Sequence, residues 1–214
     1  MNRPSTSPGP PAPRASPATR NPQRTQERIL EAALREFSAK GLAGARVDEI
    51  ARRARVNKRM LYHYFGSKDG LFSAILRRKI AEREALLASA PQDPAATLAY
   101  WFDAACQDLD WFRLLGWEAL QGADHPLVHQ QYRRTVARRA VASVRARQAQ
   151  GLLPSDLDPA HLLLSLMALT AYPLAFPQST RLVTGRSVAD PAFQRARRKF
   201  LLRFARLLHR SSTV

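Results

Sequence analysis

The sequence predicts an all-α fold. Along most of the chain after residue 24, apolar side chains recur at i, i+3, i+4 and i+7, the spacing of one helix face. Residues that commonly cap helices precede several of these segments, as in Asp158-Pro159 and Asp190-Pro191. No segment carries a strong strand pattern, and no internal repeat is present.

Composition limits the class of protein. The 34 Lys and Arg outnumber the 17 Asp and Glu, and the net charge of +17 favours a polyanionic partner without distinguishing DNA from RNA or an anionic membrane. Cys106 is the only cysteine, which excludes an intrachain disulfide and suits a reducing compartment. The N-terminus lacks the apolar core of a secretion signal, and residues 162–176, the longest apolar stretch, are shorter than the roughly 20 residues that span a bilayer. We therefore expect a cytoplasmic protein without a membrane partner.

Residues 1–22 are expected to form a disordered, basic, Pro-rich arm. The first 24 residues are rich in Pro, Ser, Thr and Arg and contain no acid, so they cannot bury a core. Two interpretations are open: a solvated leader, which we favour, or an arm that contacts the minor groove or phosphates of DNA.

Residues 25–66 predict a compact three-helix unit. The first helix is expected over residues 25–40, with Thr25 as its N-cap and Gly41 closing it. Its apolar side chains form one buried stripe, made of Ile29, Leu30, Ala33, Leu34 and Phe37.

Residues 46–65 predict a helix-turn-helix. Four apolar residues from Val47 to Ala54 share one face of the first helix, and Asn57 is placed to cap the second helix. Leu61 and Phe65 mark the inner face of that second helix, which leaves basic and polar side chains outside. Such a helix fits the major groove of DNA, where these side chains can reach bases and phosphates. The residues expected to contact DNA are Arg46, Asn57, Lys58, Arg59, Met60, Tyr62, His63 and Lys68.

Residues 25–75 resemble the N-terminal domain of the TetR (tetracycline-repressor) family of bacterial regulators. The matching features are Ile-Leu-x-Ala-Ala-x-x-x-Phe at 29–37, Gly41, Val-Asp-Glu-Ile-Ala at 47–51 and Leu-Tyr-His-Tyr-Phe-x-Ser-Lys at 61–68. The resemblance implies an all-α homodimer. Its DNA-binding domains, residues 23–83 here, would bind a double-stranded operator, and a C-terminal helical domain, residues 84–214, would bind a small effector.

Two residues depart from the usual pattern of that family. Arg46 stands where Ser or Thr commonly caps the second helix, which removes a cap worth about 1 kcal/mol. Arg55 stands where Gly is common in the turn, and a positive φ there would cost roughly 1 kcal/mol or more. Because both lie in the motif, an operator sequence taken from relatives is not expected to apply.

The C-terminal half predicts further helices. A helix over residues 67–88 would connect the two domains, aromatic-rich helical sequence follows at 95–123, and later helices are expected over 126–151, 159–176 and 191–210. The last two have wide apolar faces, which the resemblance assigns to a four-helix dimer interface; the alternative is that each serves its own core. Arginines between residues 133 and 147 are interpreted as a solvated helix face rather than a second polyanion surface.

The resemblance also implies an effector cavity between the helices of residues 95–180. Acids are scarce near the aromatic residues, so we expect a neutral, apolar effector. Aromatic and Met clusters also build ordinary cores, and that alternative stays open for each residue. The candidate lining residues are Trp101, Phe102, Cys106, Trp117, Met167 and Tyr172.

We interpret the chain as a sequence-specific DNA-binding transcriptional regulator, a repressor released from its operator by a small apolar effector. The alternative is a nonspecific basic nucleic-acid-packaging protein. An enzyme is not expected, because no motif joins Cys106 to a histidine and no Gly-rich phosphate loop is present. His125 and His129 share an i, i+4 spacing without a further ligand, so neither a metal nor a cofactor is expected.

Overall fold

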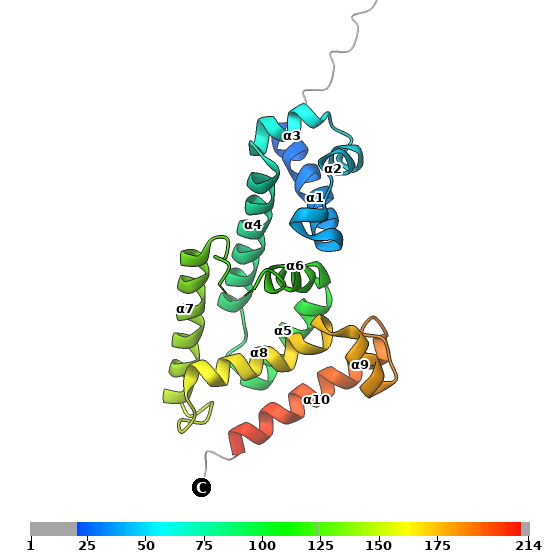
Figure 1. Cartoon of the computed structure of the whole chain (residues 1–214). Coiled ribbons are helices and arrows are strands. Elements are labelled where there is room, and N and C mark those ends of the chain that lie inside the picture. The colour runs from blue at the N-terminus through cyan, green and yellow to red at the C-terminus, as the bar shows by residue number, and fades with distance from the viewer. Residues whose placement is uncertain (1–20, 123, 211–214) are drawn as a thin grey trace, which may run out of the picture.

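The predicted all-α fold is confirmed. A computed structural model describes residues 21–122 and 124–210, and in these residues it contains ten α-helices and no strand (Figure 1). The helices are α1 (Pro22–Gly44), α2 (Val47–Ala54), α3 (Lys58–Phe65), α4 (Lys68–Ala88), α5 (Pro94–Cys106), α6 (Leu109–Ala119), α7 (Gln130–Ala149), α8 (Pro159–Ala175), α9 (Pro177–Thr184) and α10 (Pro191–Arg210).

The start of α1 differs from the prediction. Asn21, not Thr25, is the N-cap, and its Oδ1 accepts a hydrogen bond from the N–H of Gln23 at 3.0 Å. Pro22 at the first helical position favours this earlier start, because its fixed φ suits the helix and its missing N–H is not needed there. Thr25 is therefore buried inside α1, and Asn21 and Pro22, the last residues of the predicted arm, belong to the start of this helix. The rest of the predicted arm, residues 1–20, lies outside the described residues.

Two further differences concern the C-terminal half. Helix α7 begins at Gln130 rather than at Pro126, because His129 just before it adopts a left-handed conformation with φ 57°. Helix α9 was not predicted, because its buried residue is the polar Thr180 and its sequence shows no apolar stripe at helical spacing. The predicted caps of α8 and α10 are confirmed: Asp158 Oδ1 accepts from the N–H of Ala160 at 2.9 Å, and Asp190 caps α10 in the same way.

The buried apolar side chains form two clusters. The first joins α1 to α4 and includes Ile29, Phe37, Ile50, Leu61 and Leu71. The second joins α5, α7, α8 and α10 and includes Leu98, Phe102, Leu163, Phe193 and Leu201. Helix α6 serves both, because Leu114 is buried in the first cluster while Phe112 packs against the second. In Figure 1, α4 runs from the α1–α3 group down to the remaining helices.

No single helix of the described residues is long and apolar enough to cross a membrane. Helices α8 and α9 reach that length and composition together, but they are bent by 89° at the break between them.

Helix α6 is joined to α1 by a close contact at Gly41. This residue interrupts the helical conformation with φ 68°, a region that favours glycine. The indole ring of Trp117 lies against it, and a Cβ placed on Gly41 would come within 2.8 Å of Trp117 Cδ2. The indole N–H donates to the carbonyl of Ser38 at 3.1 Å. Gly41 is therefore required both by its backbone conformation and by the space that the tryptophan occupies.

We predict that Gly41→Ala lowers the free energy of unfolding by roughly 2–4 kcal/mol, the sum of left-handed strain and overpacking against Trp117. Chemical denaturation measures this loss. Gly44→Ala is the matched control, since its Cβ would meet nothing closer than Lys40 Cβ at 3.4 Å. Equal losses for the two variants would contradict the assigned role of the Trp117 contact.

Candidate nucleic-acid interface

The turn between α2 and α3 has the geometry of a tight helix-turn-helix. Arg55 ends α2 in the left-handed conformation, with φ 52° and ψ 47°, so the strained backbone that its sequence position suggested is present. The N–H of Val56 then bonds to the carbonyl of Ala51 at 3.1 Å. Ile50 and Leu61 are fully buried on the facing sides of the two helices. The turn and the shared core together fix the orientation of α3.

Side chains cap both α3 and α4, and the cap of α3 is the one that the sequence predicts. Asn57 Oδ1 accepts from the N–H of Arg59 at 2.9 Å, and Ser67 Oγ accepts from the N–H of Gly70 at 2.9 Å. Each cap satisfies an otherwise unpaired donor at a helix start. Asn57 therefore positions α3, whatever contact it makes with DNA.

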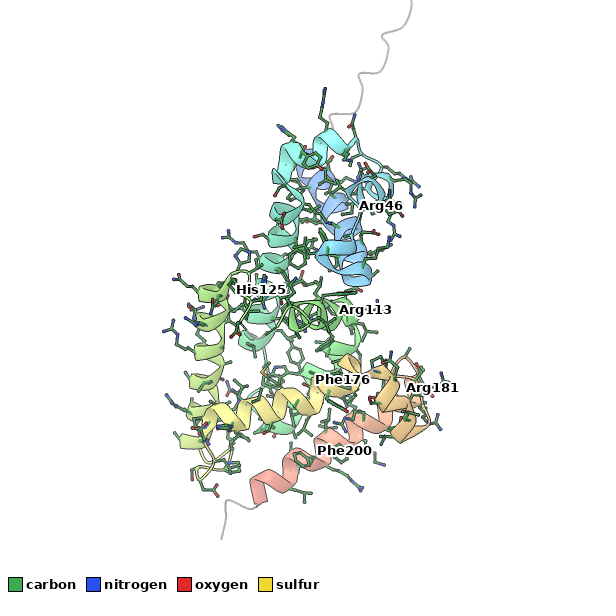
Figure 2. All side chains as sticks on the ribbon, viewed as in Figure 1. Arg46, Arg113, His125, Phe176, Arg181 and Phe200 are labelled. Carbon is green, nitrogen blue, oxygen red and sulfur yellow. The ribbon has the colours of Figure 1, made fainter. Side chains whose placement is uncertain are left out.

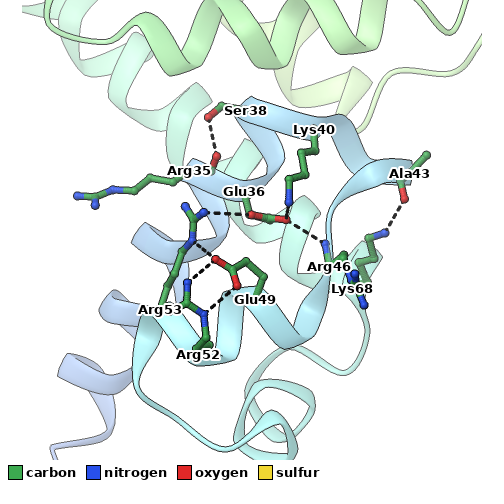
Figure 3. Close-up of polar contacts among 10 residues, drawn as sticks. All are labelled: Arg35, Glu36, Ser38, Lys40, Ala43, Arg46, Glu49, Arg52, Arg53 and Lys68. Atoms are coloured by element: carbon green, nitrogen blue, oxygen red, sulfur yellow. Dashed lines mark hydrogen bonds and ion pairs between the residues drawn. The ribbon is translucent and has the colours of Figure 1, made fainter.

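A buried glutamate compensates for the missing cap of α2 (Figure 3). Arg46 provides no side-chain cap, but its N–H donates to Glu36 Oε1 at 3.3 Å. Lys40 donates to the same oxygen at 2.8 Å, and Arg53 lies 3.8 Å from Oε2. Burial acts to raise the pKa of the fully buried Glu36, but these hydrogen bonds and charges lower it below its usual value. Glu36 is thus an ionised link between α1 and α2.

Two acids of α2 hold three nearby cations. Glu49 accepts hydrogen bonds from Arg52 and Arg53, each at 2.7 Å, and these contacts lower its pKa to about 2. Asp48 pairs with Lys58 at 2.8 Å, which lowers the pKa of the aspartate and raises that of the lysine. Lys58, one of the residues expected to contact DNA, is thus already engaged in an ion pair. Sequence reasoning missed this pair, because it joins residues ten apart on different helices.

Besides Lys58, which pairs with Asp48, the outer face of α3 presents three exposed side chains at helical spacing: Arg59, Tyr62 and His63. Tyr62 is 41% exposed. Met60 is only half-buried at the edge of this face. The structure thus brings an arginine, a phenol and an imidazole together on one side of a fixed helix.

The other predicted contact residues lie around this face. Arg46 is exposed before α2, and Lys68, at the start of α4, donates to the carbonyl of Ala43 at 3.1 Å (Figure 3). Within the described part of the chain, no ion pair engages Arg46, Arg55 or Arg59. Arg55 was not among the expected contacts, yet it is exposed in the turn beside α3. These free guanidinium groups suit a polyanion such as the DNA backbone.

A cavity of about 360 Å³ lies between α4, α5, α6, α7 and α8. Of the six candidate lining residues, Trp101 and Met167 line it. The rest of the wall is mostly apolar and includes Trp111 and Phe112, while its polar side chains are Arg83, Arg133 and Thr170.

The other four candidates lie elsewhere. Phe102 is fully buried in the second core, and Cys106 packs against that core. Burial, with a smaller effect of Asp103, raises the pKa of the Cys106 thiol to about 11, so it is neutral at physiological pH. Trp117 lies on Gly41, and Tyr172 is 54% exposed beside Phe176. Aromatic content alone could not separate these positions from true cavity walls.

A capped helix with an exposed basic face, fixed across a tight turn, defines a helix-turn-helix DNA-binding protein. Comparison with known proteins agrees. The family described as "Bacterial regulatory proteins, tetR family" matches residues 29–75, and "Tetracyclin repressor-like, C-terminal domain" matches residues 95–206. The chain belongs to the TetR family of transcriptional regulators.

Individual relatives give the same result. The chain is 37% identical over 174 residues to the HTH-type transcriptional repressor SCO4008 of Streptomyces coelicolor, which covers 78% of this chain and 88% of the relative. It is 33% identical to the HTH-type transcriptional repressor NicS of Pseudomonas putida, over 68% of this chain and 74% of the relative. The crystal structure of SCO4942 from Streptomyces coelicolor superposes with a TM-score of 0.71 at 27% identity, over 86% of this chain and 97% of the other. These likenesses support a regulator over a nonspecific packaging protein.

We predict that Glu36→Gln lowers the free energy of unfolding at neutral pH by about 1–3 kcal/mol, because the charged hydrogen bond with Lys40 and the ion pair with Arg53 are lost. The folded-state pKa of Glu36 lies below its unfolded value, so its contribution is full above that unfolded value and is lost as pH falls through the folded one. The difference between wild type and variant should therefore shrink in acid.

Denaturation of both proteins across pH tests this expectation. Glu31→Gln, on the exposed side of α1, serves as control and should stay within about 0.5 kcal/mol of wild type. A Glu36→Gln effect that persists undiminished well below the unfolded pKa would show that the charge of Glu36 is not what stabilises the link.

Proposed function

We propose that the protein is a dimeric repressor that binds a two-half-site DNA operator and leaves it when a small apolar effector binds. The observation that carries the proposal is α3: one face is fixed in the core by Leu61 while Arg59, Tyr62 and His63 project from the other. The names of the relatives SCO4008 and NicS, both repressors, support the direction of regulation. Such a regulator would act in the bacterial cytoplasm.

In the proposed complex, residues 23–83 form the DNA-binding domain and α3 lies in the major groove. Arg59 is the main base-reading side chain, because it is exposed and has no ion pair within the described residues. Tyr62, His63, Lys68 and Arg46 contact phosphates. Lys58 contacts bases only when its ion pair with Asp48 is broken and replaced by a contact with DNA.

Residues 84–214 form the regulatory and dimerisation domain of the proposal. Helices α8 and α10 carry large apolar side chains that are exposed in the single chain: Leu164 by 64%, Met167 by 50% and Phe200 by 47%. Phe200 is labelled on α10 in Figure 2. A second copy of the chain would cover such surfaces, and a two-fold dimer would present two α3 helices to two half-sites.

The proposed effector site is the cavity between α4 and α8. Its wall includes Trp111, Phe112 and Leu115 of α6, and the same helix places Trp117 on Gly41 of the DNA-binding domain. An effector that binds more tightly when α6 is in one of two positions would stabilise that position. Because α6 contacts α1, it would also stabilise one position of the DNA-binding helices. Because both half-sites must be matched at once, a shift in each subunit would weaken operator binding twice.

We predict that Arg59→Ala loses about 1–3 kcal/mol of binding free energy on the operator and tolerates more base changes, as for one lost base contact. The operator is first obtained by in vitro selection of bound DNA, and affinities are then measured on it and on random DNA at physiological salt. Lys68→Ala, the comparison, should weaken binding to both DNAs and reduce the salt slope by about one.

Two results would oppose this assignment. Equal losses on operator and random DNA would make Arg59 a phosphate contact only. Failure of selection to enrich any sequence would contradict the proposed operator binding and favour nonspecific packaging.

We predict that Asp48→Asn tightens DNA binding and steepens its salt dependence by about one unit, because Lys58 becomes free to contact DNA. Asp156→Asn makes the same charge change in the exposed loop between α7 and α8 and is the matched control. If both variants change the salt slope equally, net charge rather than the release of Lys58 is responsible.

A further inference from the structure

Three buried N–H groups without hydrogen-bond partners belong to residues that line the cavity. They are the Nε atoms of Arg83 and Arg133 and the indole Nε1 of Trp101, from α4, α7 and α5. Leaving a buried donor without a partner destabilises a protein, so three such groups around one cavity need an explanation. A bound molecule with acceptor atoms would supply it.

The two guanidinium groups are held in place from behind. Arg133 donates one hydrogen bond from each terminal nitrogen to Glu118, at 2.9 Å each, while its buried Nε has no partner. Arg83 pairs through Nη2 with Asp108, and its guanidinium lies 5.7 Å from the centre of the Trp111 ring. These contacts orient the arginines before any ligand arrives, which limits the entropy lost on binding.

The cavity wall offers donors but few acceptors. Thr170 is the one other polar side chain that lines it, and its hydroxyl donates to the carbonyl of Met167 at 2.9 Å. No Asp or Glu is among the described lining residues. A ligand with a cationic group would therefore face two arginines and no carboxylate on the wall itself.

Charge around this wall is not fully balanced by buried acids. Asp108 and Glu118 are the mostly buried carboxylates, with side chains 17% and 8% exposed. The mostly buried cations are one more in number: Lys79 at 10%, Arg83 at 20% and Arg133 at 16%. Glu82, which also pairs with Lys79, is 42% exposed and is screened by solvent. Asp108 is shared by Lys79 and Arg83, so an anionic group in the cavity would give Arg83 a partner of its own.

The rest of the wall sets the size and shape of the occupant. Trp101, Trp111, Phe112 and Leu163 provide aromatic and aliphatic surface. The volume of about 360 Å³ is near the lower end of the roughly 300–1,000 Å³ typical of ligand pockets. Both features suit a compact molecule whose body is apolar.

We propose that the cavity binds a compact apolar carboxylate, with its carboxylate group directed to the wall formed by Arg83, Trp101 and Arg133. This inference rests on the proposed effector site, and it replaces the neutral effector that the sequence predicts. The sequence could not show this, because Arg83 and Arg133 are 50 residues apart and lie on different helices.

The test measures binding of matched probes to the full chain by calorimetry. Benzoate, 3-phenylpropionate and octanoate are each compared with the alcohol and the amine of the same skeleton. We expect at least one carboxylate to bind about tenfold or more tighter than its alcohol, and its amine not to bind. An alcohol or amine that binds as tightly as the acid, or the absence of binding by all three acids, would overturn the proposal.

Two variants locate the site. Trp101→Phe keeps an aromatic ring but removes the N–H, and should weaken the best acid about tenfold while thermal unfolding confirms that the variant folds. Tyr100→Phe, next in sequence but outside the cavity wall, also removes a polar group from an aromatic side chain and should leave the affinity for the acid unaltered. Unchanged acid affinity in Trp101→Phe would overturn the assignment of this wall.

Operator binding is a separate readout. If a carboxylate binds the cavity but leaves operator affinity unchanged, the ligand class is supported and the proposed release mechanism fails. If an alcohol or amine binds instead and releases the operator, the release mechanism is supported and the carboxylate assignment fails.

Discussion

The contact of Trp117 with Gly41 is the constraint on which the placement of the DNA-binding helices depends. The indole ring fills the space that a side chain at position 41 would need, and its N–H is bonded to Ser38 in α1. One turn earlier on α6, Leu114 is buried in the core of the first four helices. Helix α1 in turn holds α2 through Glu36, and α2 holds α3 through the shared core. The position of α3 relative to the C-terminal helices therefore follows from how α6 lies.

The other side of α6 faces the cavity. The cavity is lined on this side by Trp111, Phe112 and Leu115. Glu118 of the same helix pairs with Arg133 of α7. One short helix thus contacts both the proposed effector site and the DNA-binding domain, and a ligand need not act over a long chain of residues. Densely packed side chains do not deform continuously. When a ligand changes the shape of the cavity, a small shift of the whole of α6 is therefore easier than a rearrangement of its side chains.

Local features of the fold were predictable from the sequence, whereas pairings across helices were not. The caps at Asn57, Ser67 and Asp158 follow from side chains that act within three residues, and the apolar spacing located α2 and α3. The predicted start of α1 was wrong because the sequence contains two possible N-caps. The helix begins after Asn21, with Pro22 at its first position, and not at Thr25.

The candidate site shows the same division. The exposed face of α3 follows from helix periodicity, but the pairs Asp48–Lys58 and Glu118–Arg133 depend on packing between helices. The cavity was harder still, because aromatic residues in the core and in the cavity wall have the same composition. Phe102 and Trp101 are adjacent in sequence, yet only Trp101 lines the cavity.

The most direct test of the account measures the distance between the two DNA-binding domains of the dimer. A spin label at Asp69→Cys, an exposed position at the start of α4, is introduced in a Cys106→Ser background, and electron–electron distances are recorded with operator, with a cavity ligand and with neither. We expect the ligand to move the distance distribution away from the operator-bound one, and Trp117→Ala to abolish this shift. The same distribution with and without ligand would contradict it.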